Sequence, residues 1–548
     1  EEEYLPNCDK RDIEMNELVE KTEEYLKDLV IDPNEVKVLP TFESEDGKFI
    51  SKIFCSENDI VIDDKGNVLR QPIVDKEVQI TYIVQENKAD VAYDEGTMIE
   101  NKWITVKGKD ITGDNEKPEV VPSMQEWCGN DSGKFAFSES SRIVVPEEYM
   151  DELGDAAKIT KSDIKEMFGY TVEIVSDEPK TGDLVLTFED GDETLGEQGY
   201  ILEIGNYVTI KATAYRGAFF GTRSLLQGML TSKDGTIAYG TAVDYPNYPV
   251  RKFMLDVGRK YFPMWYLEDL VKYASWLKLT DFQCHISEDT FNSYSAFRLE
   301  SDIKKGVNNG LNQADLTSTD LFYTKDEFRE FIKDSRELGV NIVPEIDTPA
   351  HSLALTKVRP DLRNGTYGRE NDHLNLVSKY DESLEFVQSI FSEYLTEENP
   401  VFDSQTTVHI GADEYNASSQ AYRKFVNDML DFVEGTGRKA RVWGSFTQAS
   451  QGEDIDAEGV EINLWNFGYA NMDKMYEDGF DLINCNDGNY YIVPNAGYYY
   501  DYLSDSTMYN LDINTISGVT IPAGRHATPQ GRSDADFLGR FRLYISRH

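Results

Sequence analysis

The chain has 548 residues, of which 40% are hydrophobic and 28% are charged, and its formal net charge is −46. A chain of this length is expected to form two or three domains with sizeable cores. The negative charge argues against nucleic acid as a partner, because binding a phosphate backbone requires clustered Lys and Arg. It also disfavours anionic membrane surfaces, and no apolar run of the sequence approaches the roughly 20 residues that span a bilayer.

The first part of the chain, residues 1–118, predicts a helix followed by a small β module. Residues 9–30 carry apolar side chains at helical spacing among many acids and lysines, which predicts an amphipathic helix. From Val36 to Val106 the pattern changes to short alternating runs, such as Val78–Val84, with turn-forming residues between them. No motif in this part indicates what it does.

Residues 119–245 predict a second module with both strands and helices. The predicted strands are residues 142–145, 171–175, 183–188 and 207–212, and a helix over residues 216–227 follows them. Elements in this order favour an α+β module. We expect its role to be support of the domain that follows.

Residues 246–548 repeat a strand, a loop and a helix. The predicted strands are residues 252–257, 281–286, 341–344, 407–410, 440–442, 460–464 and 481–484, and the predicted helices are residues 264–277, 325–338, 381–394 and 418–434. Repeated βα units of this kind predict a parallel sheet, and seven or eight of them predict an α/β fold with a (β/α)₈ barrel.

Two adjacent carboxylates stand at the end of one of these strands. The β-branched run Thr406–Ile410 leads through Gly411 and Ala412 to Asp413 and Glu414. In barrel enzymes the C-terminal ends of the strands carry the catalytic groups. A carboxylic acid with a raised pKa can protonate a leaving oxygen near neutral pH, so Glu414 is a candidate acid for cleaving a glycosidic bond.

The string from His409 to Glu414 resembles the signature of glycoside hydrolase family 20, the β-N-acetylhexosaminidases and lacto-N-biosidases. Three further stretches are similar to barrel strands of that family: Arg251–Pro263, Asp281–Asp289 and Val343–His351. One position departs from the pattern, because Gln283 stands where the family usually has His. The resemblance covers residues 120–524 and implies the barrel, a preceding accessory domain and a glycosidase activity.

The resemblance also implies a mechanism. In this family the nucleophile is the 2-acetamido oxygen of the substrate, which makes the enzyme a retaining exo-glycosidase without a protein nucleophile. Carried over, Glu414 is the acid, Asp413 accepts the acetamido N–H, and Tyr491 binds the acetamido oxygen. The expected substrate is a glycan with a terminal β-N-acetylhexosamine or lacto-N-biose.

The other candidate residues surround the same sugar. Trp443 and Trp465 are expected to wall its ring, Arg251 to bind its hydroxyls, and His351 to orient Glu414 with the help of Asp289 or Asp347. The full set expected to bind substrate is Arg251, His285, Asp289, Asp347, His351, Trp443, Trp465 and Tyr490. A metal site at His285, Asp289 and His351 is the rival interpretation, but the sequence has no H-E-x-x-H or similar ligand pair. We expect neither metal nor cofactor.

Two departures from the family leave the product and the activity open. Val493 stands where many hexosaminidases have an Asp that binds outer hydroxyls, which slightly favours a disaccharide product such as lacto-N-biose. Residues 525–548 are rich in Arg, have no Lys or Glu, and lack the Trp expected near the last strand. We interpret this tail as atypical or truncated, in which case the barrel would not be closed by its own last strand and would expose a sheet edge.

Two alternatives stay open. The missing Trp and the atypical tail favour a non-catalytic carbohydrate-binding relative with a damaged barrel. The N-terminal β module permits a structural surface protein in which the barrel is incidental. The five cysteines are far apart and form no C-x-x-C pair, so neither a zinc site nor a disulfide framework is predicted. The acidic start, Glu1–Glu3, does not resemble a signal peptide. We nevertheless expect an extracellular or cell-surface protein of a bacterium.

Overall fold

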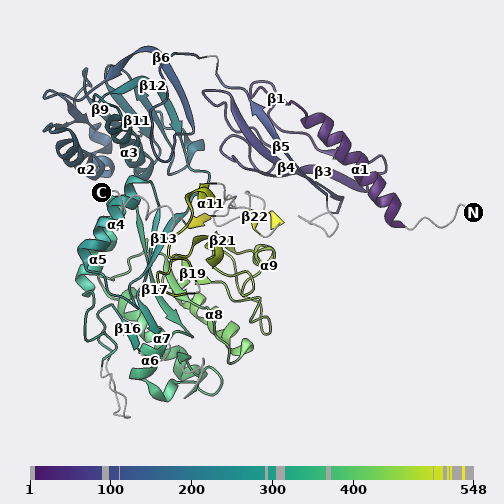
Figure 1. The fold of residues 1–548 in the computed structure, drawn as a ribbon, viewed down its shortest axis with the longest axis vertical. Helices are drawn as coiled ribbons and strands as arrows, with labels where there is room; N and C mark the ends of the chain where they lie inside the picture. The colour runs from purple at the N-terminus through teal and green to yellow at the C-terminus, as the bar shows by residue number, and fades with distance from the viewer. Residues whose placement is uncertain are drawn as a thin grey trace, which may run out of the picture. The chain divides into compact units, whose positions relative to one another are not determined.

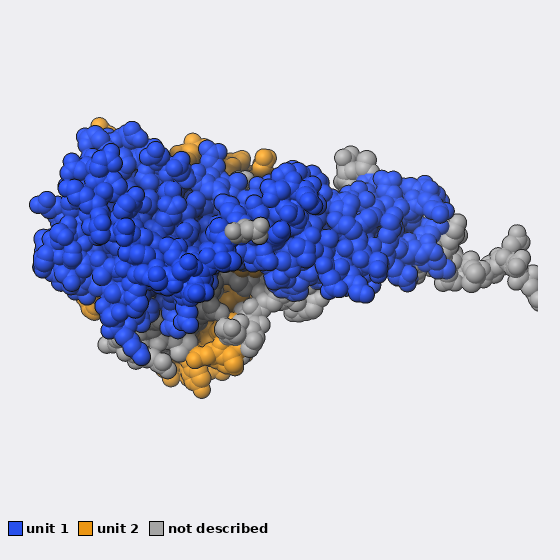
Figure 2. Space-filling model, turned by 90° about the horizontal axis from the view of Figure 1, so that it is seen from above, with its two compact units in different colours: residues 1–247, 520–525 blue, residues 248–519, 526–548 orange. Residues whose placement is uncertain are grey.

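The computed structural model describes residues 7–88, 98–109, 111–290, 294–303, 315–365, 372–497, 499–509, 515–516, 519–520 and 534–536. The chain divides into two compact units, residues 1–247 with 520–525 and residues 248–519 with 526–548 (Figure 2). The predicted boundary at residue 245 lies close to the observed one. Among the described residues, no helix combines the length and the apolar composition needed to cross a membrane.

The first sheet of unit 1 has five strands in the order β1-β5-β4-β3-β2 (Figure 1). These strands are β1 (Val30–Ile31), β2 (Phe42–Glu43), β3 (Phe49–Ser56), β4 (Lys76–Glu86) and β5 (Met98–Val106). The predicted amphipathic helix is α1 (Asn7–Leu26), which contacts β3, β4 and β5. Val78, Ile80 and Tyr82 of β4 belong to the core of this sheet. Thr81, Ile83 and Gln85 on the opposite face of the strand are buried as well, so both faces of its second half are covered.

The second sheet of unit 1 has seven strands in the order β6-β12-β10-β11-β9-β7-β8. Its strands are β6 (Glu126–Phe135), β7 (Arg142–Val144), β8 (Glu173–Val175), β9 (Leu184–Thr187), β10 (Tyr200–Ile204), β11 (Val208–Ala212) and β12 (Ile237–Asp244). The helices α2 (Met150–Phe168) and α3 (Tyr215–Thr231) pack against each other. The sequence reading did not predict α2, whose many charged residues hide a narrow buried stripe.

The two sheets belong to one compact unit, although the sequence predicted a module boundary near residue 118. Tyr245 follows the second sheet, yet its ring is buried in the core of the first, and Asn58 Nδ2 donates to its Oη at 3.1 Å. Arg70 also forms an ion pair of 2.5 Å with Glu126 at the start of β6. The residue 118 boundary therefore separates two sheets within one unit.

Unit 2 contains a closed barrel of eight strands in the order β13-β14-β17-β18-β19-β20-β21-β24. The strands are β13 (Arg251–Asp256), β14 (Asp281–His285), β17 (Asn341–Thr348), β18 (Val408–Gly411), β19 (Ala440–Trp443), β20 (Glu461–Leu464), β21 (Asp481–Asn484) and β24 (Asp534–Asp536). All seven predicted strands are present, so the predicted fold class is confirmed. The expected open edge is wrong, because β24 pairs with both β21 and β13.

Helices α4 (Met264–Trp276), α5 (Lys325–Glu337), α7 (Tyr380–Leu395) and α8 (Ser419–Glu434) flank the barrel strands in Figure 1. Local chemistry explains where two of them begin: Thr324 and Glu327 form a capping box on α5, and the Ser418 side chain caps α8. The register between neighbouring strands then determines which side chains meet at the candidate site. It places Asp256, His285, Glu345 and His409 beside one another on four successive strands.

Candidate active site

The segment after β18 carries the two adjacent carboxylates in an unusual backbone. Gly411, Ala412 and Glu414 all have positive φ, at 82°, 86° and 55°. A Cβ on Gly411 would lie 1.9 Å from Asp347 Oδ1, so only glycine fits there. Left-handed backbone at non-glycine residues is uncommon and costs free energy, and it is concentrated at functional sites. This turn directs Asp413 and Glu414 differently from a regular strand.

The Glu414 side chain is held at both carboxylate oxygens and stays 36% exposed. His351 Nε2 lies 3.2 Å from Oε2, and Tyr469 Oη donates to Oε1 at 3.1 Å. The backbone N–H of Glu414 donates to Ser445 Oγ at 3.2 Å. A carboxyl group that is oriented by two neighbours and still reachable by solvent is suited to transfer a proton to a bound substrate.

The partner of His351 is Glu288. His351 Nδ1 lies 3.0 Å from Glu288 Oε1, so the imidazole joins Glu288 to Glu414. The prediction that Asp347 or Asp289 would fill this place is corrected for Asp347, which is buried near Asp413, because Glu288 occupies this place instead. Asp289 lies in β15 (Ser287–Thr290), and its side chain is outside the described residues.

The same chain of contacts continues into the barrel through His285. Its Nε2 lies 2.9 Å from Glu288 Oε2 and its Nδ1 lies 2.7 Å from Glu345 Oε1. Trp443 Nε1 also donates to Glu345 Oε1. The prediction that His285 binds substrate is therefore corrected, because the imidazole is buried and both of its nitrogens face protein carboxylates.

Asp413 and Asp347 form a close acidic pair below Glu414. Burial, with a further contribution from the charge of Glu414, raises the pKa of Asp413 to about 6 although His351 opposes the rise. Burial and the charge of Asp413 raise the pKa of Asp347 well above its ordinary value. Asp347 is buried, so its predicted contact with substrate is corrected: its carboxyl group lies within 4.8 Å of Asp413 and His351 instead.

Ligand-type atoms of His285, Glu288 and Asp347 lie within 4.8 Å of one another, and so do those of Asp347, His351 and Asp413. We assign no metal ligands here, because both imidazoles are already placed between carboxylates. That the protein functions without a metal stays a prediction.

An aromatic cluster adjoins the carboxylates. Trp443, Trp465, Tyr469 and Tyr491 pack together, and the rings of Trp465 and Tyr469 lie 4.6 Å apart. Trp443 is only 3% exposed and Trp465 8%, so Tyr469 and Tyr491 offer most of the accessible aromatic surface. Tyr490 is 2% exposed, which corrects its predicted contact with substrate.

The predicted role of Arg251 is also corrected. Arg251 begins β13, about 16 Å from the end of the strand at the usual rise per residue, and its buried guanidinium donates to the carbonyls of Tyr248 and Lys278. Arg259, just beyond the other end of β13, is 46% exposed and forms ion pairs of 2.9 Å with Glu288 and 2.7 Å with Asp256. Arg259 is therefore the arginine at the candidate site.

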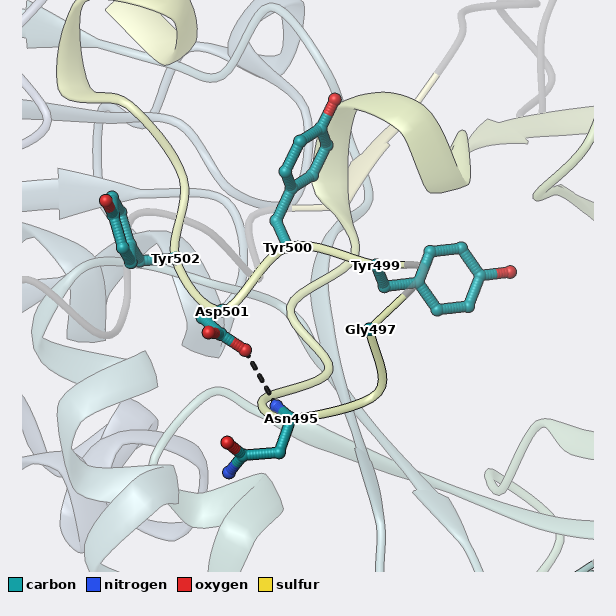
Figure 3. Close-up of a pocket in the computed structure, with 6 residues that line it drawn as sticks. All are labelled: Asn495, Gly497, Tyr499, Tyr500, Asp501 and Tyr502. Carbon is teal, nitrogen blue, oxygen red and sulfur yellow. Dashed lines mark hydrogen bonds between the residues drawn. The ribbon is translucent and has the colours of Figure 1, made fainter.

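A tyrosine-rich loop follows Tyr491. Figure 3 shows Tyr499, Tyr500 and Tyr502 projecting from it in different directions around a cavity of about 450 Å³. The ring of Tyr499 lies 5.3 Å from that of Tyr491, which connects this cavity to the aromatic cluster. Asp501 Oδ1 accepts the backbone N–H of Asn495 at 2.7 Å and closes the loop (Figure 3).

Sequence reasoning missed three residues of the site: Glu288, Arg259 and Tyr469. Glu288 and Arg259 lie inside stretches that resemble the family, shortly after the ends of β14 and β13. Their position just beyond a strand end is the signal that could have identified them. Tyr469 had no signal, because it lies in a loop after β20 and its contact with Glu414 spans 55 residues of sequence.

Comparison with known proteins agrees with the geometry. The model of "Glycosyl hydrolase family 20, catalytic domain" matches residues 248–421, and that of "Glycosyl hydrolase family 20, domain 2" matches residues 117–245. A lacto-N-biosidase of Bifidobacterium bifidum is 23% identical over 401 residues, which cover 68% of this chain and 33% of that protein. A β-hexosaminidase of Porphyromonas gingivalis is 25% identical over 54% of this chain and 38% of its own length. The chain thus spans well under half of either relative.

Solved structures show the same fold. The β-N-acetylhexosaminidase of Streptomyces coelicolor A3(2) has a TM-score of 0.59 at 18% identity, over 77% of this chain and 86% of that one. The enzyme from Bacteroides fragilis has a TM-score of 0.58 at 19% identity, over 76% of this chain and 85% of that one.

Proposed function

Because this chain belongs to glycosyl hydrolase family 20, we propose that it hydrolyses β-linked N-acetylhexosaminides at the non-reducing ends of glycans. The observation that carries this proposal is the arrangement around Glu414. One oxygen of its half-exposed carboxyl group faces His351 and the other faces Tyr469, beside a cluster of aromatic rings. This arrangement suits a proton donor at the edge of a sugar pocket.

The route that fits these residues uses the substrate as its own nucleophile. Glu414 protonates the glycosidic oxygen while the 2-acetamido oxygen attacks the anomeric carbon, and the leaving group departs as an alcohol. Asp413 accepts the acetamido N–H and stabilises the oxazolinium. Water, deprotonated by Glu414, then opens this intermediate with net retention.

Asp413 and Glu414 differ in a way that supports this division of roles. Asp413 has one buried oxygen, Oδ1, for which the described residues provide no hydrogen-bond donor. An acceptor of this kind is suited to the amide N–H of a substrate. Tyr491, half-buried against the aromatic cluster, is the candidate donor to the acetamido oxygen.

For the product of the reaction, we propose a disaccharide rather than a single N-acetylhexosamine. Val493 is 37% exposed and cannot accept a hydrogen bond from a sugar hydroxyl. The nearby cavity of about 450 Å³, lined by three tyrosines and Asp501, falls within the usual range of about 300–1,000 Å³ for ligand pockets. A single N-acetylhexosamine leaves this cavity unused, whereas a galactosyl-N-acetylglucosamine unit has a second ring to place there.

The first test is release of 4-nitrophenol from its β-N-acetylglucosaminide and its β-lacto-N-bioside. Glu414→Gln is the control for the acid. Release from the second substrate alone, together with lacto-N-biose from lacto-N-tetraose, is the expected result. Release from the first alone would replace the disaccharide proposal with a β-N-acetylhexosaminidase, and silence on both from folded protein would favour a carbohydrate-binding role. An extracellular or cell-surface location stays a prediction.

A further inference from the structure

A buried lysine lies at the inner end of the chain of contacts that begins at Glu414. Lys252, on β13, has no exposed surface, and its ammonium donates to Gln283 Oε1 at 3.0 Å. The same ammonium lies 5.6 Å from the centre of the Trp443 ring. A buried ammonium group is costly unless negative charge compensates it nearby. The position of Lys252 therefore calls for an anion close to Gln283.

Gln283 connects Lys252 to that anion. Its Oε1 accepts from Lys252 and, at 2.9 Å, from Asn463 Nδ2, while its Nε2 donates to Glu345 Oε2 at 2.6 Å. The two donors on one side identify the oxygen of the amide, so its NH₂ group must face Glu345. Gln283, which stands where the family usually has His, thus connects two buried charged groups. Its neutral amide is polarised by the Lys252 ammonium and donates to the Glu345 carboxylate.

Glu345 receives only donors from these neighbours. Gln283 Nε2 contacts one oxygen, and Trp443 Nε1 and His285 Nδ1 contact the other. An ionised carboxylate accepts several such contacts, whereas a protonated one would have to direct its O–H at a donor. Burial by itself raises the pKa of Glu345, but the charge of His285 prevails and lowers it to about 2.

His285 lies between two carboxylates, Glu345 at 2.7 Å and Glu288 at 2.9 Å. Because ionised carboxylates only accept, these two distances favour a proton on each ring nitrogen and a cationic ring, although the contact at Nδ1 lacks hydrogen-bond geometry. Burial lowers the pKa of His285, but Glu345 and Glu288 raise it well above the ordinary value.

Other charged or titratable groups also surround this chain of contacts, among them Arg441, whose charge acts on His409. Arg259 faces Glu288 at 2.9 Å, and His409 Nδ1 lies 3.8 Å from Glu345 Oε1. Burial lowers the pKa of His409 to about 3, so it is neutral. Asp347 and Asp413 lie beside His351, with Asp347 on the same strand as Glu345.

We propose that Lys252 and Gln283 are positioning residues for the acid. They hold Glu345 as an anion, which fixes His285 as a doubly protonated cation and confines the movable proton to His351 and Glu414. The role of Glu414 in this proposal rests on the proposed function, whereas the protonation of His285 does not. Trp443 is anchored by the same carboxylate, so the inner end of the chain also holds one wall of the aromatic cluster.

The test uses Lys252→Met, which keeps the length of the side chain and removes the charge. The full chain has six histidines, so ¹⁵N-imidazole NMR can follow His285 directly. In the unchanged protein, both His285 nitrogens are expected to stay protonated from pH 5 to 9, a window that brackets the usual His pKa of about 6.5. In Lys252→Met, Glu345 is less stable as an anion, so the proton between Glu345 and His285 Nδ1 is expected to shift toward the carboxylate and the Nδ1 signal to move toward its unprotonated value.

The second readout is the pH profile of kcat/KM. Loss of a cation disfavours every anion nearby, so both limbs of the profile are expected to move to higher pH by about half a unit. Gln283→Met, which breaks the bridge but keeps the lysine, is expected to cause a smaller shift in the same direction. Gln283→Met is also the replacement test variant if Lys252→Met does not fold.

The matched control is Lys272→Met on α4, whose side chain is 66% exposed. An unchanged His285 spectrum together with unmoved limbs in folded Lys252→Met would overturn the proposal. A lower kcat with neither change would also overturn it, since a purely structural role predicts that result. If the unchanged protein cleaves no substrate, the proposed function fails, but the NMR experiment still decides the protonation of His285.

Discussion

His351 and Glu414 meet side chain to side chain, with Nε2 of the imidazole 3.2 Å from Oε2 of the carboxyl group, and both residues have left-handed backbone, at φ 49° and 55°. Each such conformation costs a non-glycine residue on the order of 1–3 kcal/mol. The surrounding barrel must therefore impose both. Glu288 holds the far side of the imidazole at 3.0 Å, so the segments that follow β14, β17 and β18 together orient one acid.

The first prediction concerns Glu288. Glu288→Gln removes the charge that orients His351, so kcat is expected to fall by about 10- to 100-fold, a part of the 10²–10⁴ that a general acid contributes. Steady-state kinetics on the 4-nitrophenyl substrate measures the effect. Glu268→Gln, at an exposed position of α4, is the control. A normal kcat in Glu288→Gln, with a large loss in Asp289→Asn, would return the role to Asp289.

The second prediction is the acid limb of the pH profile. Asp413 has a pKa raised to about 6, mainly by burial, and its proposed role requires the ionised form. Below that pH the carboxyl group is protonated, so kcat/KM is expected to rise with pH and to level off above about 6. In Asp413→Asn the rate is expected to fall at least about 100-fold and this limb to disappear. A limb that persists in Asp413→Asn must come from another group.

A third prediction links Asp347 to stability. Its pKa is raised in the folded protein, so between its unfolded value and its folded value the folded state binds more protons than the unfolded state. The free energy of unfolding therefore falls as pH rises through this interval. Asp347→Asn, which keeps the size of the side chain and removes its charge, is expected to raise Tm at pH 7 by roughly 2 °C or more.

The advantage of Asp347→Asn should shrink at low pH. As the pH falls below about 4, the carboxyl group becomes mostly protonated in the unfolded state as well as in the folded state, so its charge matters less. Thermal unfolding at pH 7 and pH 3.5 measures the difference. An equal gain in Tm at both values would show that the effect comes from packing rather than from charge.

The fourth prediction separates two arginines. Arg259→Met removes an exposed cation at the candidate site and is expected to raise KM with little change in Tm. Arg251→Met leaves the carbonyls of Tyr248 and Lys278 without their donor, at a cost of about 1–3 kcal/mol each for a buried unpaired group. It is expected to lower Tm and leave KM unchanged. The reverse pattern would restore Arg251 as a substrate-binding residue.

The barrel was predictable from the sequence because its signals are local. Seven strands and four helices appear where apolar runs and 3.6-residue periodicity predicted them, within a few residues at each end. The eighth strand, β24, was not predicted, since three residues are too few for a pattern. The helix α2 was missed because charged residues surround its buried stripe.

The amino-acid sequence by itself determined the barrel, the accessory sheet and the pair Asp413 and Glu414, since short-range pattern and a specific motif carry that information. Tertiary structure alone decided which carboxylate faces His351, which arginine reaches the site, and that Gln283 joins Lys252 to Glu345. These contacts depend on register between strands far apart in the chain. A shift of one residue turns a side chain to the opposite face of a sheet, so the sequence names the candidates while only the folded barrel selects among them.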